Sequence, residues 1–92
     1  QLMENKLIGK YAVLYEFRID GAKRPKKQML IIDVIGNYAF VEYLDWASGN
    51  PMHCGLCTLK QIHEDDWTLH NSHAELDDHI KRRFPRFKKE NA

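Results

Sequence analysis

The residues best suited to chemistry in this chain lie in one short segment, His53-Cys54-Gly55-Leu56-Cys57. A Cys-x-x-Cys turn can present two thiolates to a zinc ion, and the neighbouring histidine could be a third ligand. A structural zinc site usually has four ligands, and the sequence contains no second cysteine pair. The alternative is that Cys57 is a small core residue and Cys54 lies in a loop. The sequence therefore favours no bound cofactor, with zinc at His53, Cys54 and Cys57 as the competing interpretation.

Histidines are frequent, and four of the five lie between positions 63 and 79. Pairs such as His70 and His73 could bind a metal or act as acid and base. Catalysis also needs a positioned nucleophile or a substrate pocket, and no nucleophile elbow, phosphate loop or dinucleotide fingerprint occurs. We therefore expect most of these histidines to be solvated or capping residues, with His79 exposed.

Ten of the fourteen basic residues fall in two short segments. They could form one phosphate-facing surface if the loop over 22–27 and the end of the C-terminal helix are adjacent. The pI of about 8.0, however, is below the values above about 9 that are typical of nucleic-acid-binding domains. The alternative is a solvated tail and a charged loop that keeps a sheet edge from pairing. The ten residues are Lys23, Arg24, Lys26, Lys27, Lys81, Arg82, Arg83, Arg86, Lys88 and Lys89.

Aromatic residues exceed what a barrel this small can bury, and some of them lie near carboxylates. Aromatic rings beside carboxylates suit a cationic ligand such as methyl-lysine, or a peptide groove. The alternative is that a helix predicted over 72–84 covers these rings. The candidate partner-binding residues are Tyr38, Phe40, Trp46, Asp33 and Glu42 from this surface, and Lys23, Arg24, Lys26, Lys27, Arg82, Arg83 and Arg86 from the basic segments.

A predicted hairpin over 28–46 positions the aromatic residues. Gly36-Asn37 suits a two-residue turn between two apolar runs, because glycine tolerates positive φ. With this turn, Ile32 faces Val41 across the two strands. One face is then wholly apolar and consists of Leu30, Ile32, Val34, Ala39, Val41 and Tyr43. The other face mixes Met29, Ile31, Phe40 and Leu44 with Asp33 and Glu42.

Further strands follow from apolar alternation and turn residues. Alternation predicts a first strand over 8–19. Residues 47–55 are predicted to form a loop, followed by strands over 56–62 and 67–69. Trp67, in the last of these, is expected to be buried.

The pattern becomes helical at Ser72. Ser72 and Glu75 fit a capping box, and apolar residues follow at a spacing of four. Pro85 disfavours helical geometry at the residue before it, so the helix is predicted to end at Phe84. A loose basic tail is predicted over 85–92.

Four or five short strands followed by one helix predict a mainly β fold with a C-terminal α-helix. The sheet would be a small antiparallel barrel or a strongly bent sheet of four to five strands. Strand count and size resemble those of SH3-like barrels such as Tudor and chromo-barrel modules, a resemblance that implies a fold and no residue roles. The 92 residues predict one domain over 1–84 plus the basic tail over 85–92.

The chain has no apolar run near the ~20 residues that span a bilayer and no visible secretory signal, so we expect a cytoplasmic protein. The expected function is that of a non-catalytic binding module that recognises a protein or nucleic-acid partner. Apolar surface that a narrow helix cannot cover predicts a homo-oligomer, most simply a dimer. The alternatives are a metal-binding protein and a small enzyme whose site forms between subunits.

Overall fold

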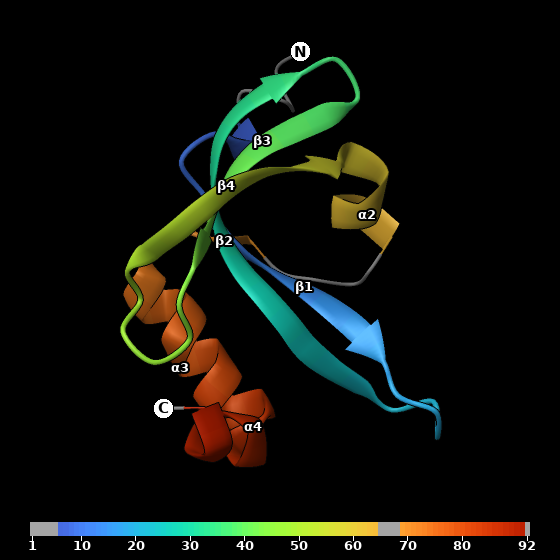
Figure 1. Cartoon of the computed structure of the whole chain (residues 1–92), viewed down its shortest axis with the longest axis vertical. Coiled ribbons are helices and arrows are strands. Elements are labelled where there is room, and N and C mark those ends of the chain that lie inside the picture. Colours follow the sequence, from blue (N-terminus) through green and yellow to red (C-terminus); the bar gives the residue numbers. More distant parts are fainter. Residues whose placement is uncertain (1–5, 65–68, 92) are drawn as a thin grey trace.

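The computed structural model describes residues 6–64 and 69–91, and its main feature is an antiparallel sheet of five strands (Figure 1). The strand order is β4-β3-β2-β1-β5. In the described residues β4 and β5 are the two edges, so the sheet is not closed into a barrel. The predicted mainly β class with a C-terminal helix is confirmed, whereas the SH3-like barrel is not. The elements are β1 Tyr11–Phe17, β2 Lys23–Ile35, β3 Tyr38–Leu44, β4 Pro51–Thr58, α2 Leu59–Glu64, β5 Leu69–His70, α3 His73–Arg83 and α4 Pro85–Asn91.

The hairpin between β2 and β3 forms at the predicted turn. Gly36 has a φ of 59°, a backbone conformation that glycine adopts without strain. Ile35 pairs with Tyr38, and Val34 pairs with Ala39. These pairs are the predicted ones, so the tip of the hairpin is confirmed.

Below the tip, the predicted faces of β2 are wrong because a β-bulge shifts the register. Ile32 is the extra residue, and Ile31 pairs with Val41 in its place. This extra residue moves the side chains that precede it in β2 to the face opposite the predicted one, while the pairs at the tip are unchanged. Met29 and Ile31 are therefore fully buried, while Ile32 is 40% exposed.

The predicted loop over 47–55 is also wrong in most of its length, because β4 begins at Pro51 and ends at Thr58. The Oγ1 atom of Thr58 accepts a hydrogen bond of 3.1 Å from the backbone N–H of Gln61. In return, the Oε1 atom of Gln61 accepts one of 3.0 Å from the backbone N–H of Thr58. This reciprocal pair is a capping box, and it starts helix α2 where a strand was predicted.

The strand predicted over 67–69 corresponds to β5, which runs over Leu69–His70 and pairs with β1. Trp67, which was predicted to be buried, lies outside the described residues.

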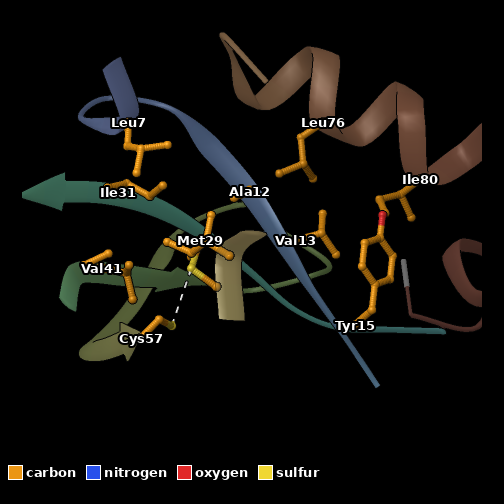
Figure 2. Packing of buried hydrophobic residues seen from close by; sticks show 12 residues of the cluster. Leu7, Ala12, Val13, Tyr15, Met29, Ile31, Val41, Cys57, Leu76 and Ile80 are labelled. Carbon is orange, nitrogen blue, oxygen red and sulfur yellow. Dashed lines mark hydrogen bonds between the residues drawn. The ribbon is translucent and has the colours of Figure 1, made fainter. Parts of the chain in front are cut away.

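The sheet buries apolar side chains on both of its faces around β1 (Figure 2). Ala12 and Val13 are neighbours in the strand, so they point to opposite faces, yet both are fully buried. On one face, Leu76 and Ile80 of α3 lie over β1. Because both faces of β1 are covered, its side chains do not simply alternate between buried and exposed, as was predicted for the first strand. The buried cluster comprises Leu7, Ala12, Val13, Tyr15, Met29, Ile31, Ala39, Val41, Cys57, Ile62, Leu76 and Ile80.

Helix α3 begins as predicted. Ser72 is its N-cap, and the Ser72 hydroxyl accepts a hydrogen bond of 3.2 Å from the backbone N–H of Glu75. The helix ends at Arg83, with Phe84 as its C-cap.

The residues after Phe84 form helix α4 instead of a loose tail. Phe87 meets Trp46 edge to face, with ring centroids 4.8 Å apart. Lys88 is 13% exposed, pairs with Asp77 at 2.5 Å and donates a hydrogen bond of 3.3 Å to the backbone carbonyl of Trp46. These contacts connect α4 to α3 and to the loop that follows β3.

Candidate functional site

The three predicted zinc ligands do not converge. Because side chains of a strand alternate between faces, Cys54 and Cys57 point to opposite sides of β4. Cys54 is exposed, whereas Cys57 is 2% exposed and lies in the core. His53 contacts the ring of Tyr43, with ring centroids 5.1 Å apart. Among the described residues, no three histidine, cysteine, aspartate or glutamate side chains are grouped closely enough to hold a metal ion.

Cys57 acts as a core residue. Its Sγ atom lies 3.3 Å from the hydroxyl of Tyr43 and 3.9 Å from the Sδ atom of Met29. Burial, together with the hydrogen bond to Cys57, raises the pKa of Tyr43 to about 12. The Tyr43 phenol is therefore neutral at physiological pH, and it shares this part of the core with the Cys57 thiol.

Two histidines lie together where α3 meets the sheet. The rings of His70 and His79 have centroids 5.0 Å apart, and the Nε2 atom of His79 lies 3.2 Å from the hydroxyl of Tyr15. Burial lowers the pKa of both histidines below the usual 6.5. His79 is half-buried, so its predicted exposure is wrong.

His73 belongs to a separate polar contact beneath α3. Its Nε2 atom lies 3.1 Å from the Oε1 atom of Gln28, which is almost fully buried. Gln28 in turn donates a hydrogen bond of 2.9 Å to the backbone carbonyl of Asp45. The contact satisfies a buried amide, so it explains His73 without any catalytic role.

The aromatic candidates separate into two places. Tyr38 and Phe40 are exposed, and they point to the same side of β3 as Glu42. Trp46 contacts Phe87 of α4 and donates a hydrogen bond of 3.3 Å to the carbonyl of Lys26. Helix α3 therefore covers only part of this side of the sheet, and Trp46 does not join the other two rings. We define the outer hairpin face as Asp33, Ile35, Tyr38, Phe40, Glu42 and Leu56. Phe40 pairs with Asp33 on one side and Leu56 on the other, and Tyr38 pairs with Ile35.

Cations from both basic segments converge in one groove of about 470 Å³ between the β1–β2 turn and the junction of α3 with α4. The predicted candidates Lys23 and Arg24 line one wall, and Arg83 and Arg86 line the other. Arg18, which lies outside the two basic segments of the sequence, also lines it. We define the basic groove by its lining residues, which are Arg18, Ala22, Lys23, Arg24, Arg83, Phe84, Pro85, Arg86, Phe87 and Glu90.

The two walls of the basic groove are fixed by turn and ring contacts. On the sheet side, Asp20 accepts a hydrogen bond of 3.0 Å from the backbone N–H of Ala22 and shapes the β1–β2 turn. On the helix side, the ring of Phe84 packs on Tyr15 with centroids 5.6 Å apart. The ammonium of Lys23 lies 5.0 Å from the centroid of the same Tyr15 ring. Tyr15 thus connects both walls.

Carboxylates balance part of the positive charge. Arg24 pairs with Glu16 at 2.7 Å, and Arg18 approaches Asp20 at 3.7 Å. Within the described part of the chain, neither Arg83 nor Arg86 forms an ion pair. The helix wall therefore carries two guanidinium groups that are available to an anionic ligand.

The other basic candidates lie outside the groove. Lys27 stacks over the ring of Tyr43 at 4.4 Å from the centroid, and Arg82 pairs with Asp78 at 2.9 Å. Lys26 is exposed on β2 and does not line the groove. Arg82 and Arg83 are thus sequence neighbours of equal charge, of which only Arg83 lines the groove.

Comparisons with the known protein families, with curated proteins and with solved structures found no match. Among the described helices, none has the length and apolar character of a membrane-spanning segment.

Proposed function

We propose that this chain is a non-catalytic binding module whose basic groove binds nucleic acid. The observation that carries the proposal is the convergence of five cationic side chains, separated by some sixty positions in the sequence, on one open groove. Clustered cations lower the free energy of binding to a phosphate backbone because they release its condensed counterions.

The kinds of side chain support the same ligand. Four of the five cations are arginines, whose planar guanidinium can bind a phosphate through two parallel hydrogen bonds. Phe84 and Phe87 add apolar wall area, and only Glu90 among the lining residues is acidic. The composition therefore suits a phosphate backbone better than a cationic peptide.

The direct test is a titration of labelled single-stranded and double-stranded oligonucleotides, followed by fluorescence anisotropy at several salt concentrations. If three to five phosphates are neutralised, log K should fall with log salt with a slope of about −2 to −3.5 for single strands. Absence of binding at low salt would refute the proposal.

Arg83→Gln and Arg82→Gln form a matched pair of variants for the same titration. Each removes one positive charge from the same helix, but only Arg83 lines the groove. We expect Arg83→Gln to weaken binding several-fold and to reduce the salt slope by about 0.7, as for the loss of one phosphate contact. Arg82→Gln should bind like the wild type. Equal losses in both variants would show that only net charge matters.

A second proposal concerns assembly, and one observation favours it: the edge strand β4, Pro51–Thr58, contains no charged residue. Edge strands usually carry charges that prevent pairing with another chain. Antiparallel pairing of β4 with β4 of a second copy is self-complementary about a two-fold axis, and it would bring two outer hairpin faces next to each other. We therefore propose a homodimer formed through this edge.

Light scattering over a range of concentrations tests whether the dimer forms. Cross-linking through Cys54 tests how the two β4 strands are aligned. Because a disulfide requires Cα atoms within about 7 Å, mild oxidation should link two Cys54 residues only if the strands pair near their centres. Leu56→Lys places a charge on β4 and should yield monomers. A wild-type protein that remains monomeric at all concentrations would contradict the proposal.

A further inference from the structure

Two large apolar side chains are exposed at the tip of the β1–β2 ribbon, beside the basic groove. Phe17 is 68% exposed, and Ile19 is fully exposed. Single exposed apolar residues are common, but a solvated phenylalanine between cations is the arrangement on which a nucleobase can stack.

The sheet register places Phe17 on the groove side of the ribbon. Phe17 pairs with Lys23, and directly paired residues of an antiparallel sheet project from the same face. Lys23 lines the basic groove. Phe17 itself lines an adjoining hollow of about 510 Å³, which shares Arg18 and Arg24 with the groove. The two hollows therefore adjoin at these two arginines.

The charges differ between the two hollows. Around Phe17, Arg24 is paired with Glu16, and Arg18 lies 3.7 Å from Asp20. The helix wall of the basic groove carries Arg83 and Arg86 without such partners among the described residues. Phosphates would therefore favour the groove, and the less charged hollow would favour an uncharged base.

We propose that Phe17 is a stacking platform for one base of single-stranded nucleic acid whose phosphates lie in the basic groove. This inference rests on the proposed function and specifies that the bound nucleic acid is single-stranded. A paired duplex keeps its bases inside the stack, so only an unpaired strand offers a base to a side chain on the surface. An anionic membrane is the less favoured partner, because two carboxylates, those of Glu16 and Asp20, line the hollow beside Phe17 and would repel anionic headgroups.

The test compares Phe17→Ala with the wild type on an oligothymidylate of about 15 nucleotides and on an abasic oligomer of the same length. Loss of one stacked base should weaken binding to oligothymidylate by about five- to 150-fold. Binding to the abasic oligomer should be unchanged, because it has phosphates and no bases. Ile8→Ala, which truncates an exposed apolar side chain away from both hollows, is the control and should bind like the wild type.

Two further variants separate stacking from general apolar contact. Phe17→Trp keeps an aromatic ring, should retain binding, and should show fluorescence quenching by oligothymidylate beyond that of the wild type. Phe17→Leu keeps apolar area without a ring, so it should bind as weakly as Phe17→Ala. Full binding by Phe17→Leu would overturn the inference, and so would Phe17-dependent binding to phosphatidylserine vesicles in place of oligothymidylate.

The binding experiments distinguish a failure of the proposed function from a failure of this inference. If oligothymidylate binds and Arg83→Gln weakens it while Phe17→Ala does not, stacking is refuted and the basic groove stands. If no oligonucleotide binds at low salt, both are refuted.

Discussion

At the scale of single residues, the positions of the histidines suggest a contribution to stability. His70 and His79 pack against each other where α3 meets the sheet, and burial lowers the pKa of both. In the unfolded chain these imidazoles are protonated as the pH falls through about 6.5, whereas in the folded chain they are protonated only at lower pH. Above about pH 6.5 both states carry neutral imidazoles, and this stabilising contribution is fully present. This contribution is lost as the pH falls below about 6.5.

We expect urea unfolding to show a lower midpoint at about pH 5.5 than at about pH 7.5. His79→Gln should reduce this difference, because it removes one of the two half-buried imidazoles whose pKa burial lowers. The contribution of Asp77 to stability can be distinguished from that of the histidines because it is lost in a lower pH range. Burial raises the pKa of Asp77, but hydrogen bonds from Lys88 and Lys81 outweigh burial and lower it, so its contribution is lost only as the pH falls below about 3.8. An unfolding midpoint that does not change between the two pH values would contradict the prediction for the histidines.

At the scale of elements, the bulge in β2 decides which isoleucines form the core. Apolar alternation could not locate it, because residues 29–32 are all apolar and either register is compatible with them. Next to the bulge, the carboxylate of Asp33 accepts a hydrogen bond of 2.8 Å from the backbone N–H of Val34. The capping box at Thr58 was readable, since Thr58-Leu59-Lys60-Gln61 has the required spacing.

Two neighbouring substitutions test the bulged register. Ile31→Ala should lower the free energy of unfolding by about 2–5 kcal/mol, because it leaves a cavity in the core. Ile32→Ala should cost less than about 1 kcal/mol, because that side chain is partly in water. Denaturant unfolding of both variants measures the difference. A larger loss of stability for Ile32→Ala than for Ile31→Ala would contradict the bulge and support the regular register that alternation predicts.

At the scale of the whole molecule, the convergence of the two basic segments depended on how α3 crosses the sheet. The sequence identified Lys23, Arg24, Arg83 and Arg86 as candidates but could not show that they lie together, because local patterns do not determine contacts across sixty residues. Arg18 was missed because a single cation within a strand pattern has no distinguishing neighbour. The zinc candidates Cys54 and Cys57 lie apart for a local reason: a spacing of three residues places side chains on opposite faces of a strand, although it brings them together in a turn.

The length of β2 has a consequence for how the molecule can be used. This strand of 13 residues begins at the basic groove, ends at the outer hairpin face, and runs along most of the molecule's longest dimension of 37 Å (Figure 1). The two proposed surfaces therefore lie at opposite ends of one continuous strand, separated by its length. A substitution in the basic groove and one on the outer hairpin face thus test separate parts of the molecule.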